Sequence, residues 1–392
     1  MPPTLVSPRV TTTARELNEL YFANGWTDGL PVVPPTPDVV AEFVESTGLP
    51  PDHVVAVFPD RNRSVTIEKI AVNSVMAGCL PQYLPVIITA VETMAMPEFE
   101  FNHIACLRSA FPHFVVNGPI VRELEMNTGV WMWGSGDRAT TTISRALSLI
   151  LWNCLAQRPG AVQAGAFGIP GRQSSLVVAE NEDVTDQHGN GWEPLHTMFG
   201  YDATDSVVTC VSLCPGFGQV MLSLEDAEYL ATAMLEHVFA SFHKAPYLIT
   251  IPPPMARTFI GAGWSKQDLS DYLKERARYS VAWLKKSGRW GRAAQDFPGN
   301  RWDPDEYRPK PGDENEYIHL FSKEPGPWDL YVFSQHELDD PRQEIMIIVA
   351  GGDGAMDMAW RVPHNGGQWA SKKIDRQAGA TATGPTQSPE GG

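Results

Sequence analysis

The sequence predicts an α/β or α+β fold, with a mixed sheet and interleaved helices. Short runs rich in β-branched residues recur along the whole chain, and stretches with apolar residues at three- and four-residue spacing separate them. This alternation argues against an all-β fold and against a helical bundle. The strands of the sheet are expected near Val54, Val115, Leu176, Val207, Leu248 and Ile345.

The length and composition allow one large domain or two ordinary ones. The chain has 392 residues, of which 43% are hydrophobic and 19% are charged, as in globular proteins. We expect a flexible lead over 1–14, a main α/β domain over 15–250, a smaller α/β C-terminal region over 251–370 packed on it, and a disordered tail over 371–392.

The charge and the cysteine content restrict the partners and the compartment. A formal net charge of −16 argues against a nucleic acid or an anionic membrane as the partner, because both are bound through basic patches. No apolar run is long enough to cross a bilayer, and no signal peptide is recognisable. Five unclustered cysteines fit a reducing compartment better than a disulfide scaffold. We therefore expect a cytoplasmic protein with a small-molecule substrate, and the apolar density is compatible with a homo-oligomer.

The first elements flank a stiff loop with an aromatic tip. A short amphipathic helix over 15–24 leads into the segment GWTDGLPVVPPT, and a second helix over 37–47 follows. The prolines fix φ and keep the preceding residues extended, so this loop costs little entropy to hold in place. It suits a pocket wall, with Trp26, Thr27 and Asp28 as substrate contacts. An ordered plug, in which Trp26 fills the core, is an equally good interpretation.

Two apolar helical segments, over 66–78 and 81–96, meet at Cys79. Gly78 is a stop signal for the first, and prolines stand near the start of the second. The N-terminus of a helix carries partial positive charge and free N–H groups, which would favour a thiolate at Cys79 and make it a nucleophilic or redox group. Cysteine is also a small apolar residue that is common in buried positions, and this alternative stays open.

The segment WMWGSGDR stands before a long helix expected over 139–157. Glycine loops that open a helix expose N–H groups to an anion, and the helix dipole adds to the attraction. Arg138 would then supply a bidentate partner for a carboxylate or a phosphate. The segment lacks the Gly-Lys-Ser/Thr of a P-loop, and the alternative is a tight turn with Asp137 as a helix cap.

A short buried strand over 176–179 ends in Glu180, Asn181 and Glu182, and His196 follows after a loop. Polar side chains at strand ends are frequent site residues in α/β folds. We expect Glu180 and His196 to move protons and Asn181 to contact the substrate. The chain has no HExxH or CxxC element, so no metal ligand is assigned, and a solvated acidic turn is the simpler alternative.

Further helices are expected over 224–242 and 266–286, the second with Ser265 as its N-cap. Lys266, at the start of the second, would hold an anionic substrate. The strand over 345–350 runs into a glycine loop. The GxGxxG fingerprint of a dinucleotide fold is missing there, so the cofactor stays unknown.

Several segments together resemble a known family. They are GWTDGLPVVPPT, EKIAVNSVMAGCLPQYLPV, GxPGR with AENED, WEPLH, GWSK and VAGGDG, spread over about 15–354. The chain is similar to a family of largely uncharacterised bacterial proteins found with, or fused to, the UGSC-motif (seleno)proteins. The resemblance implies redox or thiol-dependent chemistry. Because this chain has no UGSC or CGSC string, it also implies a UGSC-type partner subunit. The family pattern has a histidine where this chain has Ile169, so the chemistry would differ if that histidine takes part.

The residues support three hypotheses about function. In the first, an enzyme acts on a small substrate with Cys79 as a nucleophilic or redox thiol, while Glu180 or His196 moves protons and Arg138 or Lys266 holds the substrate if it is anionic. In the second, a hydrolase or lyase uses Glu180, Glu182 and His196 to activate water, with or without a metal. In the third, a non-catalytic subunit binds and positions a thiol-bearing partner.

Overall fold

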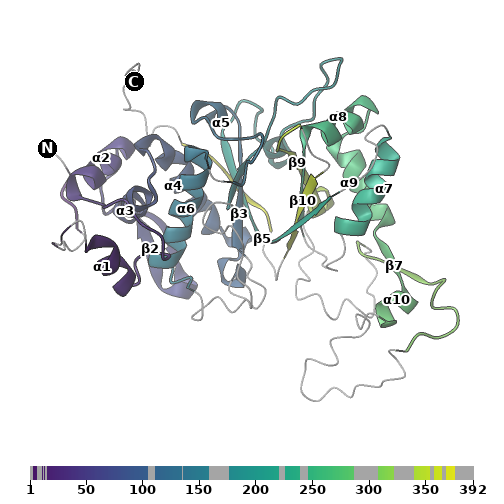
Figure 1. The fold of residues 1–392 in the computed structure, drawn as a ribbon, viewed down its shortest axis with the longest axis horizontal. Coiled ribbons are helices and arrows are strands. Elements are labelled where there is room, and N and C mark those ends of the chain that lie inside the picture. The colour runs from purple at the N-terminus through teal and green to yellow at the C-terminus, as the bar shows by residue number, and fades with distance from the viewer. Residues whose placement is uncertain are drawn as a thin grey trace.

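The computed structural model confirms the expected fold class, since helices alternate with strands that pair in both parallel and antiparallel fashion (Figure 1). The residues that it describes are 3–6, 11, 13, 16–104, 111–134, 136–158, 176–219, 226–238, 246–286, 308–321, 340–353, 357–363 and 368–375.

The helices form largely where apolar periodicity predicts them. They are α1 (Leu17–Ala23), α2 (Pro37–Thr47), α3 (Ile67–Ala77), α4 (Leu84–Met94), α5 (Ile120–Glu123), α6 (Arg138–Asn153), α7 (Ala227–Val238), α8 (Pro253–Gly261), α9 (Lys266–Arg276) and α10 (Val281–Lys286). Thr66 caps α3 by accepting a hydrogen bond from the Lys69 N–H, and Gly78 ends it with φ 86°. Ser265 and Asp268 form a capping box at the start of α9. Within the described ranges, no helix combines the length and the apolarity that a membrane span requires.

Seven strands form the main sheet, and two further pairs stand apart from it. The strands are β1 (Val54–Phe58), β2 (Arg63–Thr66), β3 (Phe111–Asn117), β4 (Val177–Ala179), β5 (Val207–Gln219), β6 (Tyr247–Ile251), β7 (Arg278–Ser280), β8 (Tyr317–His319), β9 (Ile345–Val349), β10 (Asp357–Pro363) and β11 (Ala370–Lys373). The order in the main sheet is β4-β3-β5-β10-β6-β9, and β11 pairs with the start of β5. The pairs β3–β4 and β6–β9 are parallel, and the other pairs are antiparallel.

Side chains along β3 and β9 alternate between an outer and an inner core, as the two-residue period of a strand requires. In β3, Phe114 and Val116 pack in the core that includes α3, α4 and α6, whereas Val115 packs in the inner core. In β9, Ile347 packs with α8 and α9, whereas Ile348 packs in the same inner core as Val115. Helices α2–α4 and α6 therefore lie on one side of the strands and α7–α9 on the other (Figure 1).

The two ends of the sheet path approach each other. Asn181, just beyond β4, donates its backbone N–H to the Val349 carbonyl at the end of β9, at 2.7 Å. Gly351 donates its N–H to the Thr128 carbonyl at 2.8 Å, close to the same place. The main sheet thus curls around the inner core, and the segments that follow β4 and β9 meet at one edge.

Two expected elements differ from the structure. The strand at Val54 is β1, which pairs with β2 and does not join the main sheet in the described part of the chain. The helix expected over 266–286 is interrupted: α9 ends at Arg276, and β7 precedes α10. The interruption follows from the pairing of Tyr279 with Ile318 of β8, which holds this segment extended.

The predicted start of the disordered tail, at residue 371, is wrong because it falls inside a strand. Residues 371–373 complete strand β11, whose Lys373 pairs with Val207 of β5. Residues 376–392 lie outside the described residues, as does most of the lead over 1–14.

Candidate functional site

The inner core ends in a group of polar side chains at the ends of β3 and β4. Asn117 follows Val115 at the two-residue spacing of a strand, and Glu180 follows Val178 in the same way. Both polar side chains therefore lie on the inner side of the sheet, and both are buried. Sequence reasoning predicted Glu180 as a site residue, and the structure adds Asn117.

Glu180 is held by three donors that come from three different elements. Lys266 of α9 contacts Oε1 through its Nζ at 2.5 Å. The Asn117 Nδ2 donates to Oε2 at 2.6 Å, and the Leu195 backbone N–H donates to the same oxygen at 2.8 Å. A buried charge needs such compensation, because desolvation of an unpaired carboxylate costs several kcal/mol.

Lys266 occupies a position that helix stability does not explain. It is the first residue of α9, where the positive end of the helix dipole disfavours a cation. It is buried, and its charge is matched by Glu180. The position of this ammonium group is therefore explained by its ion pair with Glu180 and not by stabilisation of the helix.

Glu182 is the partly exposed member of the group. Its Oε1 accepts from the Asn117 Nδ2 at 2.9 Å and from the Gly118 N–H at 2.7 Å. No described residue donates a hydrogen bond to its Oε2, and 20% of its side chain is exposed. Gly118 has φ 87°, and a Cβ there would lie 2.0 Å from the Asp205 carbonyl oxygen, so only glycine fits.

His196 lies beside Glu182 and is fully buried. Its Nε2 lies 3.0 Å from the Asp202 carbonyl oxygen, and its Nδ1 lies 3.9 Å from the Glu182 Oε1. The distance on the Nδ1 side is too long for a direct hydrogen bond, and Nδ1 has no hydrogen-bond partner in the described part of the chain. We call Asn117, Glu180, Glu182, His196 and Lys266 the Glu180 cluster.

A cavity of about 640 Å³ adjoins the backbone that carries the cluster. Pro119 lines it, one residue after the Gly118 that donates to Glu182. Asp205, Ser206 and Lys373 line it as well, and Lys373 forms an ion pair with Asp205. Hydrogen bonding to Lys373 lowers the pKa of Asp205, so this carboxylate stays charged at neutral pH.

The structure does not suggest a metal site in the Glu180 cluster. In the described residues, no group of three or more His, Cys, Asp or Glu side chains has the arrangement of a metal site. The Glu180 carboxylate already accepts three hydrogen bonds from the protein. The cluster is held together by these hydrogen bonds and by the ion pair of Lys266 with Glu180.

Cys79 lies elsewhere, in surroundings that favour the protonated thiol over the expected thiolate. It is buried, and burial raises its pKa from 9.0 to about 12, although Arg138 and Arg145 lower it in part. Its Sγ contacts the Thr142 carbonyl of α6 at 3.3 Å, which is an acceptor and not a donor. A 3-10 turn at Pro81–Tyr83 separates Cys79 from α4, so the thiol does not meet the free N–H groups of that helix.

Arg138 binds protein backbone in this structure. Its Nε and Nη2 donate to the Gly78 carbonyl at 3.3 and 3.2 Å, at the end of α3. Asp137 caps α6 by accepting from the Thr140 N–H at 2.7 Å, as the alternative interpretation of this loop predicted. The anion-binding role of Arg138 stays a prediction, and Arg138 shares no hydrogen bond or ion pair with the Glu180 cluster.

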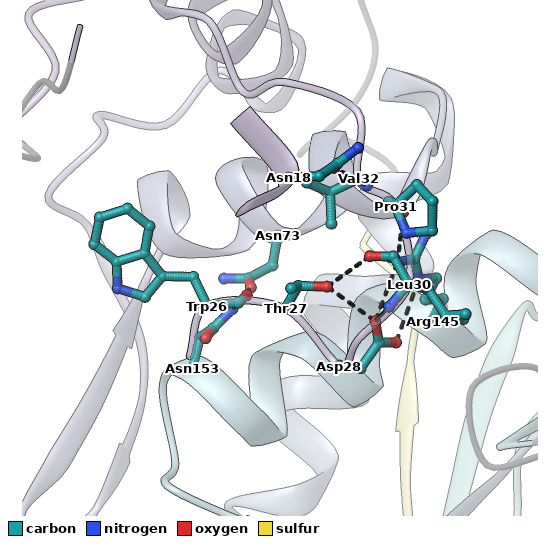
Figure 2. A network of polar contacts seen from close by, with 10 residues as sticks. All are labelled: Asn18, Trp26, Thr27, Asp28, Leu30, Pro31, Val32, Asn73, Arg145 and Asn153. Carbon is teal, nitrogen blue, oxygen red and sulfur yellow. Dashed lines mark hydrogen bonds and ion pairs between the residues drawn. The ribbon is translucent and has the colours of Figure 1, made fainter. Parts of the chain in front are cut away.

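The GWTDGLP loop is fastened to α6 by a polar network (Figure 2). Arg145 donates to Asp28 Oδ1 at 3.2 Å and to the Pro31 carbonyl at 2.8 Å. Thr27 donates to the Leu30 carbonyl at 2.7 Å, within the loop itself. Trp26 is exposed and does not fill the core, and its carbonyl accepts from Asn153 at 3.0 Å. Thr27 and Asp28 thus make contacts within the protein that an ordered loop requires.

The predicted site residues therefore fall into two groups. Glu180, Glu182 and His196, which the second hypothesis names, lie close together, and Lys266, expected to hold an anionic substrate, pairs with Glu180 instead. Asn181 lies next to them, but its Oδ1 accepts from the Asp183 N–H at 3.2 Å within a turn. Cys79, Arg138 and the loop from Trp26 to Asp28 lie around α6, and no hydrogen bond or ion pair of the described residues joins the two groups.

Comparisons with known proteins identify no family, since no protein-family model matches the chain and no curated protein is significantly similar to it. The resemblance to the UGSC-associated proteins stays a prediction. Ile169, where the family pattern differs, lies outside the described residues.

Proposed function

We propose that the protein is an enzyme of the lyase or hydrolase type, which moves protons through Glu182 and His196. The observation that carries the proposal is the pairing of these two titratable side chains, 3.9 Å apart, at the end of the inner core. Pairs of titratable groups in different environments are the usual arrangement for acid and base roles. Here His196 is buried, whereas Glu182 is partly exposed.

The exposure of each side chain suggests its role. Glu182 is the group that a substrate can reach, and its free Oε2 would accept a proton from water or from the substrate. His196 would share that proton through Nδ1. Glu180 and Lys266 are buried behind them and act as positioning residues, because Asn117 donates to both carboxylates.

Thiol chemistry has less support from this chain. Burial raises the pKa of Cys79 to about 12 and that of Cys154 to about 11, and it raises the pKa of Cys210 well above its ordinary value. A buried thiol that keeps its proton is a poor nucleophile. The first hypothesis would need another sulfur, from Cys106, Cys214 or a partner subunit, and the side chains of Cys106 and Cys214 lie outside the described set.

Turnover of a substrate panel tests the proposal. Small β-hydroxy and β-amino carbonyl compounds report elimination, and small esters and amides report hydrolysis, both followed by proton NMR. Glu182→Gln and His196→Asn should each lower the rate constant kcat by about 100-fold or more, the usual size of a general acid–base contribution. Full activity in both variants would refute the assignment.

Two comparisons separate chemistry from folding. Glu228→Gln changes an exposed carboxylate at the start of α7 and should leave turnover unchanged. Cys79→Ala should leave turnover unchanged as well. Complete loss of turnover in this variant would instead favour the thiol hypothesis. Unfolding midpoints in urea, measured for every variant, show which losses of activity are losses of structure.

A further inference from the structure

The hydrogen-bond partner of His196 determines which of its nitrogens carries the proton. Nε2 lies 3.0 Å from the Asp202 carbonyl oxygen, which can only accept a hydrogen bond. Nε2 must therefore be the donor. In the neutral ring Nδ1 is then an acceptor, and it faces a carboxylate oxygen of Glu182 at 3.9 Å. Two acceptors face each other across a gap that contains no donor from the described residues.

Asn117 adds a third acceptor. Its Nδ2 lies 2.6 Å from Glu180 Oε2 and 2.9 Å from Glu182 Oε1, so the amide orientation is fixed by the two carboxylates. Its Oδ1 is fully buried and has no partner within the described part of the chain. A buried acceptor without a partner destabilises the folded protein, and a donor from a ligand would remove that cost.

The charges of the Glu180 cluster favour a cationic ligand. The Glu180 cluster holds two carboxylates, of Glu180 and Glu182, against the one ammonium group of Lys266, which is paired with Glu180. One negative charge is left over, on the carboxylate with the free oxygen. The adjoining cavity has the same sign, because the described residues that line it include two carboxylates, Asp205 and Asp375, and one cation, Lys373.

We infer that the Glu180 cluster binds the ammonium group of a small amine, which donates to Glu182 and to His196 Nδ1. Such a group supplies several N–H donors and one positive charge, which the unpaired acceptors and the excess negative charge require. The inference rests on the proposed function, for which it specifies the substrate class as amines. An anionic substrate would meet no unpaired cation among the five residues of the cluster.

Binding of methylammonium chloride tests the inference without any turnover. The side-chain ¹⁵N signals of His196, assigned with His196→Asn, are followed while the salt is added, with sodium chloride at the same ionic strength as the reference. We expect a saturable shift of the Nδ1 signal. Glu182→Gln should weaken binding by at least tenfold, which corresponds to about 1.4 kcal/mol, whereas Glu228→Gln should leave it unchanged.

Two further probes identify what is recognised. Tetramethylammonium has the charge without N–H donors, and methanol has a donor without the charge, so both should bind at least tenfold more weakly than methylammonium. Equal binding of either probe, or no saturable shift with methylammonium, would overturn the inference. Because no reaction is measured, such a failure would leave the proton-transfer proposal standing. If instead Glu182→Gln keeps full turnover, the proton-transfer proposal is refuted. Methylammonium binding is measured separately and does not depend on that result.

Discussion

Glu180 is a buried anion with protein donors on both oxygens. Removal of its charge and removal of the Lys266 charge should therefore change the free energy of unfolding by different amounts. Lys266→Met leaves the carboxylate buried without its cation, so we expect a loss of about 3–5 kcal/mol in the free energy of unfolding. In Glu180→Gln/Lys266→Met the charge is gone, and the glutamine oxygen can still accept from Asn117 and Leu195. The double variant should therefore be more stable than Lys266→Met, as measured by urea unfolding.

One result of comparing Lys266→Met with Glu180→Gln/Lys266→Met would contradict this expectation. If the double variant is as unstable as Lys266→Met, the cost comes from lost packing of the lysine chain and not from an uncompensated charge. Turnover would still be reduced in Glu180→Gln/Lys266→Met, because the two residues position Asn117 and Glu182.

The Cys79 thiol predicts a pH dependence of stability. Its pKa is raised by burial from 9.0 to about 12, so between these values the unfolded chain loses the proton while the folded chain keeps it. The unfolded state is then favoured as the pH rises, by about 1.4 kcal/mol per pH unit for this thiol. Wild type should therefore lose more stability than Cys79→Ala between about pH 9 and pH 11 in urea unfolding experiments.

Alkylation checks the same thiol independently. At about pH 8, iodoacetamide should label Cys79 in urea but not in the folded protein, because the folded thiol is protonated and buried. Rapid labelling of folded protein at Cys79 alone, read by peptide mass spectrometry, would show that the thiol is accessible and would contradict its placement.

Arg145 of α6 makes the largest number of contacts with the part of the loop from Asp28 to Pro31. Arg145 reaches Asp28 and two backbone carbonyls of the loop, and the side chains of Arg145 and Asp28 are only 16% and 6% exposed. Arg145→Met should lower the free energy of unfolding by about 3 kcal/mol, because it leaves a buried carboxylate unpaired. Urea unfolding measures the loss, and hydrogen exchange should show the loop opening first.

An exposed ion pair provides the matched control. Arg122 and Asp183 form a pair whose side chains are 73% and 66% exposed. Arg122→Met should cost less than about 1 kcal/mol, as exposed pairs do. Equal losses in the two arginine variants would mean that burial of the loop contact has been overestimated.

Local signals explain which elements the sequence could predict. Pro37–Thr47, Ile67–Ala77 and Tyr247–Ile251 have strong apolar periodicity or β-branched runs with clear stop signals, and they form where expected. Strand β7 interrupts an expected helix because its extended form depends on β8, about forty residues later in the chain. Helix α8 begins with prolines, which are well tolerated in the first turn of a helix but give no apolar periodicity that would predict one.

The candidate site was predictable in part for the same reason. Glu180 follows a recognisable strand and Lys266 begins a recognisable helix, and polar residues at such boundaries are frequent site residues. Asn117 is the last residue of β3, and the two-residue period places it on the same side as Val115. The sequence Asn117-Gly118-Pro119 is also typical of a turn, so Asn117 could equally be predicted as a turn residue. The pairing of Lys266 with Glu180 depends on the curl of the sheet, which brings residues 86 positions apart into contact.

The inner core joins the two helical layers into one structure. Val115 and Val178 reach it from the N-terminal side, and Leu248 and Met346 reach it from the other, while Val211 contributes from β5. Separation of the two layers would expose all of these side chains to water, at about 25 cal/mol per Å² of apolar surface. We therefore expect the layers to unfold together and not one at a time.

Leu269→Ala tests this coupling. Leu269 is buried among α9, α8 and β9, far along the chain from α3 and α4, and its truncation should cost about 2–5 kcal/mol. If the inner core couples the layers, amide hydrogen exchange measured by mass spectrometry in low urea should speed up equally in α3–α4 and in α8–α9. Faster exchange confined to α8–α9 would show two independently unfolding units, with the Glu180 cluster at the junction where they separate.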